Sequence, residues 1–231
     1  MRVRDAEATR RRILEAAKVE FADKGLSGAR VDRIAERADI NKRMLYVYFG
    51  NKDDLFLAVL EEVYADIRDA ERELDLEHLA ARDALLRLVR FTWDYYVANP
   101  EFLRLVNSEN LHKAEHLRRS TRILEMHSPF IRMIADLLDR GVREGVFRPG
   151  VDPNQLYISI AALGYYYLTN RFTLSVIYSR DMGSGEARAE RLGFIEDMVL
   201  RCVTAMPDGC VAAMPDGGDG QAGTEREGGC G

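Results

Sequence analysis

The sequence predicts an all-α protein of 231 residues, in which a small N-terminal head precedes a larger helical body. Apolar residues recur at helical spacings of three and four along most of the chain, and no stretch alternates convincingly as a β-strand does. Charge is also divided, since residues 1–52 carry 13 Lys and Arg against 8 Asp and Glu, whereas residues 53–231 carry 20 against 30. We therefore expect a basic head at residues 1–52, an acidic body at 53–204 and a separate tail at 205–231.

Two short amphipathic helices separated by a tight turn are predicted between Val31 and Phe49. The first carries an apolar stripe at helical spacing, formed by Val31, Ile34, Ala35 and Ala38. Asp39 and Ile40 turn the chain, and the side chain of Asn41 can cap a second helix that begins near Lys42. This spacing is typical of a helix-turn-helix, which lays its second helix in the major groove of DNA.

The second helix of the pair has an inner and an outer face. Leu45 and Phe49 are expected to face inward, together with Met44 or Tyr48. The residues left on the outside are Lys42, Arg43, Tyr46 and Val47. Lys and Arg can neutralise phosphate or bond guanine, a Tyr hydroxyl can bond a phosphate oxygen, and Val can pack on a thymine methyl. The outer face therefore has the chemistry of a DNA-recognition helix.

A long connecting helix is predicted at residues 52–74, directly after the recognition helix. Asn51 is placed to cap it, and two acids, Asp53 and Asp54, occupy the first turn, where the helix dipole favours negative charge. Its apolar stripe consists of Leu55, Val59, Val63 and Ile67. Such a helix can couple the head mechanically to the body, while Lys52 at its start lies beside the groove.

Residues 39–55, DINKRMLYVYFGNKDDL, resemble the signature of the tetracycline-repressor (TetR) family of bacterial regulators. Residues 9–25 resemble the first helix of that family, whose apolar side chains pack on the helix-turn-helix and match Ile13, Leu14, Ala17 and Phe21. The resemblance covers about the first quarter of the chain and implies DNA contacts from Asn41, Lys42, Arg43, Met44, Tyr46, Val47, Tyr48 and Lys52. It also implies a regulator, expected to be a repressor, that leaves its operator when a small effector binds.

The head departs from the family pattern at several positions. Asp39 stands where Gly is usual, and Arg43 and Met44 replace residues that are often small or hydroxylated, so no base preference carries over. Arg30 stands where a Ser or Thr cap is common, which weakens the cap and offers a phosphate contact. An ordinary amphipathic bundle is the alternative to DNA binding, but the capping, core spacing and Tyr-x-Tyr-Phe run would all have to coincide.

The arginines near the N-terminus leave two interpretations open. Residues 1–12 contain Arg2, Arg4, Arg10, Arg11 and Arg12. This segment could be an arm that follows the DNA backbone or minor groove, or a disordered leader that keeps the protein in solution.

The body is predicted to consist of further helices. We expect one at residues 84–98, ended by Asn99-Pro100 with Asn99 as a cap, a broken pair at 101–120 and a long helix at 121–143. The last two are expected at 153–168, opened by Asp152-Pro153, and at 186–206, and the junction before them resembles the place where the family's dimerisation helices begin. A single head reads few base pairs, so we expect a homodimer on a palindromic double-stranded operator. The alternative is that these helices only close a monomer core.

Aromatic and polar residues mix in the middle helices, and the resemblance implies a small-molecule cavity there. The candidate ligand-binding residues are Trp93, Tyr96, Asn110, His127 and Tyr165. The alternative is that most of these aromatic side chains belong to the core.

Residues 112–116 match the H-x-x-E-H spacing of inverted zinc peptidases. On a helix, His112 and His116 would share a face with Glu115 nearby, so a metal-dependent hydrolase or a metal sensor is the alternative function. No third ligand is evident, and we expect these residues to be solvated surface groups. Neither a phosphate loop nor a dinucleotide fingerprint occurs, so we expect no enzyme, no cofactor and no metal.

The remaining features limit which classes of protein are possible. No apolar run approaches the ~20 residues of a membrane span, and the N-terminus lacks an apolar signal core, so we expect a cytoplasmic protein without membrane contact. Cys202, Cys210 and Cys230 have no CxxC spacing, and Cys202 is expected in a helix core. The tail, with AMPDG at 205–209 and again at 213–217, is expected to be disordered.

Overall fold

The computed structural model describes residues 3–204, and within this range the chain forms nine α-helices and two short 3₁₀ helices. An isolated bridge between Phe147 and Thr204 is the β-type pairing found among the described residues. The α-helices are α1 Val3–Gly28, α2 Val31–Arg37, α3 Lys42–Phe49, α4 Lys52–Arg72, α5 Ala81–Ala98, α6 Pro100–Leu111, α7 Thr121–Arg143, α8 Pro153–Ile177 and α9 Gly185–Val203. The predicted all-α class is confirmed, whereas the tail at 205–231 lies outside the described residues.

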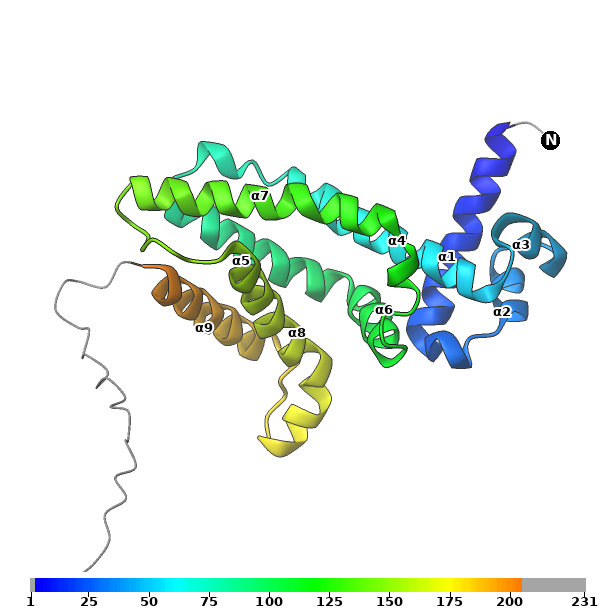
Figure 1. The fold of residues 1–231 in the computed structure, drawn as a ribbon. Coiled ribbons are helices and arrows are strands. Elements are labelled where there is room, and N and C mark those ends of the chain that lie inside the picture. The colour runs from blue at the N-terminus through cyan, green and yellow to red at the C-terminus, as the bar shows by residue number, and fades with distance from the viewer. Residues whose placement is uncertain (1–2, 205–231) are drawn as a thin grey trace, which may run out of the picture.

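Helices α1, α2 and α3 form the head, and the start of α4 packs against α1 and α3 (Figure 1). Its core contains Phe21 of α1, Ile34 of α2, Leu45 of α3 and Phe56 of α4, and the Phe21 and Phe56 rings meet edge to face at 5.1 Å. The α1 helix already runs through residues 3–12, so the interpretation as a disordered leader is wrong for this part. An arm that follows the DNA stays a prediction for it.

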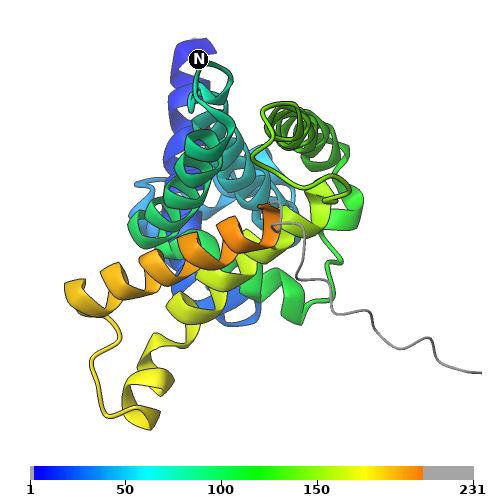
Figure 2. The ribbon, with the colours of Figure 1, turned by 90° about the vertical axis from the view of Figure 1, so that its left-hand side faces the viewer.

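Three long helices, α4, α5 and α7, run alongside one another through the body (Figure 1). Helices α8 and α9 pack together and cross α5 on the side away from α4 (Figure 2). The short helix α6 packs against α1, so it joins the body to the head. Between α6 and α7 lie a turn and the 3₁₀ helix Leu117–Arg119, and a second 3₁₀ helix, Leu76–His78, follows α4.

Most of the predicted helix starts have the expected caps. The side chains of Asn41, Asn51 and Asp152 each accept a hydrogen bond from a backbone N–H in the first turn of α3, α4 and α8. The prediction for Asn99 was wrong, because its side-chain amide donates back to the Tyr95 carbonyl at 2.9 Å and caps no N–H of α6.

The C-terminal helices differ from prediction in length and in one side chain. Helix α8 continues nine residues beyond the predicted end at 168. Its polar residues fit a helix because Thr169 and Ser175 donate their hydroxyl protons to carbonyls four residues earlier. Cys202 is exposed on α9, not in the core as expected, since Val199 and Val203 occupy the buried positions. Among the described helices none has the length and apolar character of a membrane span.

Candidate DNA-binding surface and ligand cavity

Helix α3 has the two faces that its sequence predicts. Leu45 and Phe49 are buried against the head core, while Met44 and Tyr48 are half-buried. The Val47 side chain is 70% exposed and Tyr46 42% exposed, and Lys42 and Arg43 lie on the same open side. In Figure 1 this helix lies at the end of the molecule remote from α9. A duplex can therefore approach α3 without meeting the body.

Two interactions fix the start of α3. The Asn41 side chain accepts a hydrogen bond from the Arg43 N–H at 2.8 Å. Lys42 Nζ lies 2.7 Å from Oδ1 of Asp32 on α2, and both side chains are exposed. The hydrogen bond between them raises the pKa of Lys42 above its usual value and lowers the pKa of Asp32 below its own. In the free protein the Lys42 charge is thus engaged by an acid that a phosphate would have to displace.

The turn between α2 and α3 uses a left-handed residue. Asp39 has φ 52°, a conformation that glycine adopts freely and that Asp and Asn tolerate better than other L-residues. This geometry accounts for the departure from the family pattern, because Asp can occupy the position at which Gly is usual.

Three further basic residues lie on the elements next to α3. Arg30 is exposed, and its side chain does not cap α2. The backbone N–H of Arg30 instead donates to Oε1 of the buried Glu20 at 3.0 Å, so the Glu20 carboxylate holds the start of α2. Lys52 is half-buried at the first residue of α4. The Arg10 guanidinium lies 5.3 Å from the centre of the Phe49 ring, which places α1 beside the recognition helix. The contact of Arg10 was missed because it joins residues that are far apart in sequence.

The body contains a cavity of about 570 Å³ among α4, α5, α6, α7 and α8, which is open to solvent on one side. Four of the five candidate ligand residues line it together: Tyr96, Asn110, His127 and Tyr165. Trp93 does not line it, because its ring is buried against Tyr167 with the ring centres 5.8 Å apart. The Tyr165 hydroxyl donates a long hydrogen bond of 3.4 Å to Oδ1 of Asn107.

The cavity also holds a cation that sequence reasoning missed. Arg68 of α4 lines it and is 5% exposed, and its Nη2 donates to the Tyr157 hydroxyl at 2.8 Å. Its Nη1 lies 3.0 Å from Oε2 of Glu71, one turn further along α4 and 1% exposed. Burial raises the pKa of Glu71 to about 8, against the lowering effect of the Arg68 charge. Burial, and then the charge of Arg68, lower the pKa of His127.

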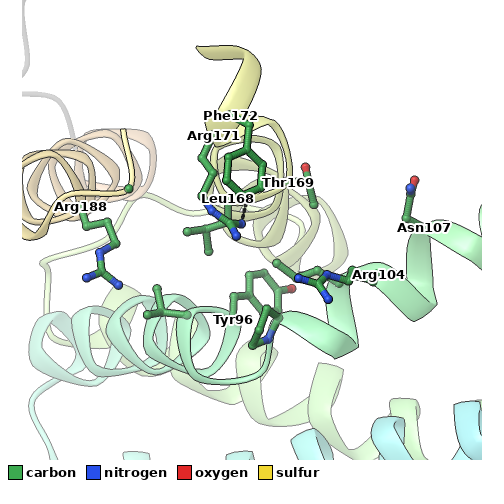
Figure 3. Close-up of a pocket in the computed structure, with 12 residues that line it drawn as sticks. Tyr96, Arg104, Asn107, Leu168, Thr169, Arg171, Phe172 and Arg188 are labelled. Atoms are coloured by element: carbon green, nitrogen blue, oxygen red, sulfur yellow. Dashed lines mark hydrogen bonds between the residues drawn. The ribbon is translucent and has the colours of Figure 1, made fainter. Parts of the chain in front are cut away.

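A smaller cavity of about 290 Å³ lies on the other side of Tyr96. Figure 3 shows Arg104 of α6, Arg171 of α8 and Arg188 of α9 around it. Arg171 is held in place because its Nη1 donates to the Leu168 carbonyl at 2.8 Å. The sequence offers no motif that would have found these three arginines, since they come from three different helices.

The zinc-peptidase spacing at residues 112–116 does not form a helical face. Helix α6 ends at Leu111, and Lys113 and Ala114 have φ values of 55° and 58°. His116 is 4% exposed, so the expectation of a solvated surface residue was wrong for it, and its Nδ1 lies 2.8 Å from Oε2 of Glu109. Within residues 3–204 no cluster of three or more His, Cys, Asp or Glu is arranged to hold a metal ion. The premise of the alternative function, two histidines on one helix face, is therefore wrong.

A helix-turn-helix with an exposed basic recognition helix, mounted on an α-helical body, is the architecture of a class of DNA-binding transcriptional regulators. The family model described as bacterial regulatory proteins, tetR family, matches residues 13–59. A second model, the Tetracyclin repressor-like C-terminal domain, matches residues 82–199. The chain belongs to the TetR family, as the resemblance of its head predicts.

Curated relatives cover nearly the whole protein. The HTH-type transcriptional repressor NicS of Pseudomonas putida is 38% identical over 87% of this chain and 95% of its own length. The HTH-type transcriptional repressor SCO4008 of Streptomyces coelicolor is 33% identical over 81% of this chain and 93% of its own. The expected function, a DNA-binding transcriptional repressor, is confirmed by these relatives and by the family match.

Solved structures share the fold. A regulatory protein of the tetR family from Rhodococcus RHA1 has a TM-score of 0.67 at 20% identity and covers 86% of this chain and 98% of its own. A candidate transcriptional regulator from Saccharomonospora viridis, solved in complex with choline, has a TM-score of 0.66 at 21% identity and covers 85% of this chain and 98% of its own. At these identities the likeness concerns the fold alone.

Proposed function

We propose that this repressor binds a palindromic operator as a homodimer and leaves it when a small molecule occupies the cavity of the body. The observation that carries the proposal is the recognition helix, whose Tyr46 and Val47 are open to solvent while Leu45 and Phe49 hold it on the head core. We keep the division into a reading head at residues 1–52 and an effector and dimerisation body at 53–204 as part of this proposal.

The proposed DNA contacts divide by chemistry. Arg43, Met44 and Val47 face base edges, and the bidentate guanidinium of Arg43 suits guanine. The groups that meet phosphate are Arg30, Asn41, Lys42, Tyr46, Tyr48 and Lys52. The Tyr48 hydroxyl is buried and has no hydrogen-bond partner among the described residues, so it would have to turn outward to donate to a phosphate. DNA as the partner also implies that the protein works in the cytoplasm, where the chromosome lies.

The homodimer is supported by the apolar residues that α8 and α9 leave exposed. They include Tyr166, Phe172, Val176 and Ile177 on α8, Tyr178 just after it, and Phe194 and Met198 on α9. Monomers seldom expose so many large apolar side chains on two adjacent helices, and obligate interfaces are rich in them. A second copy of the chain, related by a twofold axis, would cover this surface and set the spacing of two α3 helices.

Effector release would run through α4. This helix begins at Lys52 beside the DNA-binding surface and reaches the cavity at Tyr64 and Arg68. A ligand among Tyr96, Asn110, His127 and Tyr165, with Trp93 packed behind them, would shift α4 only if it bound one position of the helix more tightly than another. No catalytic step is part of this proposal.

Selection of bound fragments from a random duplex pool tests the DNA-binding part of the proposal. A palindrome with half-sites about 34–36 Å apart is expected, since two reading heads then meet one face of the duplex. Tyr46→Ala and Lys52→Ala should weaken binding to all sequences and lower its salt dependence, while Arg43→Ala should relax the base preference at one position of each half-site. Arg87→Ala, an exposed residue of α5, is the control. Parent-like binding by all three head variants would overturn the assignment of α3.

A further inference from the structure

We propose that the effector is a small organic anion, a carboxylate on a flat apolar body, and that Arg68 binds its charge. This inference rests on the proposed function, in which the cavity among α4 to α8 takes the effector. The fold leaves the charge class of the ligand open, and the side chains that line the cavity decide it.

Arg68 supplies a positive charge to a cavity wall that contains no acid. Of the described residues that line the cavity, none is Asp or Glu, and the others are apolar, aromatic, Asn or His side chains. The Nε and Nη1 atoms of Arg68 are buried and make no hydrogen bond within the protein. A guanidinium donates five hydrogen bonds, and since Nη1 faces Glu71, Nε is the donor of Arg68 that no described residue engages.

Glu71 does not fully cancel this charge. Its Oε2 lies 3.0 Å from Nη1 of Arg68, and the Arg68 charge and the Tyr157 hydroxyl only partly offset the effect of burial on its pKa. Burial raises its pKa to about 8, so near neutral pH this carboxyl compensates the charge of Arg68 less fully than an ordinary glutamate would. Burying a poorly compensated cation costs free energy, so a ligand whose anionic group pairs with Arg68 should bind more tightly than a neutral one.

The walls around Arg68 fit a flat apolar body. The guanidinium carbon lies 4.1 Å from the centre of the Phe130 ring and 5.4 Å from that of Tyr157, and these two rings meet edge to face, so the cation lies against an aromatic pair. Tyr64, Tyr96 and Phe102 supply further rings along the cavity. Burial raises the pKa of Tyr157 to about 12 and that of Tyr64 as well, so these phenols keep their protons and can donate to a carboxylate.

A ligand cation is the competing chemistry, because aromatic rings can also cage a quaternary ammonium, and one structural neighbour was solved with choline. In this cavity the fixed charge of Arg68 would repel such a group, and no lining acid among the described residues would compensate. If the effector is an anion, anionic probes should bind more tightly than cationic ones, and if it is a cation the order should be reversed.

Three probes of the same shape separate the classes: benzoate, neutral benzamide and cationic phenyltrimethylammonium. Binding to the purified full-length protein is measured by titration calorimetry at neutral pH. Benzoate should bind about tenfold or more tightly than benzamide, as expected for a charge-assisted hydrogen bond, and phenyltrimethylammonium should bind weakest. Equal or reversed affinities, or no saturable binding of benzoate at millimolar concentration, would overturn the proposal.

Variants of Arg68 connect the charge preference to this residue. Arg68→Met keeps the length of the side chain and should reduce benzoate affinity to that of benzamide, whereas Arg68→Lys should retain part of the preference. Arg72→Met, an exposed position one turn further along α4, is the matched control and should leave the preference unchanged. A preference that survives in Arg68→Met, or is lost in both Met variants, contradicts the role of Arg68. Melting temperature and operator binding confirm that each variant is folded.

The same titrations keep the two proposals apart. Benzoate that binds through Arg68 without weakening operator binding would refute effector release and leave the charge class of the cavity standing. A neutral or cationic compound that releases the operator would refute the anion and leave effector release standing.

Discussion

Nδ1 of His116 lies 2.8 Å from Oε2 of Glu109, and both side chains are almost fully buried where the body meets the head. Oε1 of Glu109 also accepts the backbone N–H groups of His116 and Leu117, each at 2.9 Å. The His116 ring packs edge-on against Phe56 of α4 at 5.1 Å, and its Nε2 lies 3.8 Å from Oδ1 of Asp53. The turn after α6 is thus attached to the first turns of α4, next to the DNA-binding surface.

Glu109→Ala should therefore destabilise the protein. It leaves two buried donors and one half-buried donor without an acceptor, and we expect a loss of about 3 kcal/mol in the free energy of unfolding. Urea unfolding at fixed protein concentration measures the change. Glu115→Ala removes an exposed acid from the same turn and should cost less than about 0.5 kcal/mol. Equal stability of the two variants would show that this network does not hold the turn.

The ion pair between Lys42 and Asp32 predicts a variant that binds DNA more tightly. Asp32→Asn frees Lys42 for phosphate and removes a negative charge from beside the recognition helix. We expect operator affinity to rise severalfold at low salt, with a steeper dependence on salt concentration. Fluorescence anisotropy of a labelled operator over a range of salt concentrations measures both quantities.

Asp69→Asn is the control for net charge, since Asp69 is exposed on α4 within the body. It changes the charge of the protein by the same amount but should leave operator affinity nearly unchanged. Weaker binding by Asp32→Asn than by the parent would mean that the pair with Lys42 orients α3 for DNA and does not compete with it.

Features of the head that depend on local sequence were predictable. Asn41 and Asn51 cap helices that start at the next residue, and Leu45 and Phe49 are buried as their spacing requires. Each of these features depends on residues within about one helical turn. The prediction of a cap failed at Asn99, whose side-chain amide donates to the Tyr95 carbonyl of the preceding helix and does not cap α6.

Features of the body that depend on distant contacts were not predictable. No sequence pattern distinguishes Arg68 from the other charged residues of α4, and only the packing of α7 and α8 buries it beside Phe130 and Tyr157. The cavity aromatics were identified by composition, but Trp93 turned out to pack on Tyr167 because α8 crosses α5 there. Both contacts depend on how the helices pack against one another, and the spacing of residues along one sequence does not reveal that packing.

The proposed dimer surface can be tested with one charged substitution on α8. The Val176 side chain is 80% exposed among the apolar residues of α8 and α9. Val176→Arg should have little effect on the fold of one chain but should place a charge inside the interface, so we expect a shift from dimer to monomer in analytical ultracentrifugation. Operator affinity should fall strongly, because a single head reads only half of a palindrome.

Leu124→Arg provides the matched control for Val176→Arg. Leu124 of α7 is also a highly exposed apolar residue, and it lies on a different helix. This variant should remain dimeric and bind the operator like the parent. Dimers of Val176→Arg with unchanged mass and operator affinity would place the interface elsewhere.

The buried carboxyl of Glu71 predicts how stability depends on pH. Burial raises its pKa from the ordinary value of 4.5 to about 8 in the folded protein. Between these two values the unfolded chain binds fewer protons than the folded one, so the free energy of unfolding should fall as pH rises. The contribution is fully present below pH 4.5 and is lost as pH rises through about 8, with a slope of at most about 1.4 kcal/mol per pH unit.

Glu71→Gln removes this titration and keeps the shape of the side chain. Urea unfolding from pH 5 to 8 should show a clearly flatter profile in this variant, and the variant should be more stable than the parent near pH 8. Burial also raises the pKa of Asp66, which contributes in the same direction, so a smaller slope should remain. Glu73→Gln, at an exposed position just after α4, should keep the parental slope. A parental slope in Glu71→Gln would mean that the carboxyl stays ionised beside Arg68 throughout this range, which would remove the poorly compensated charge from the cavity.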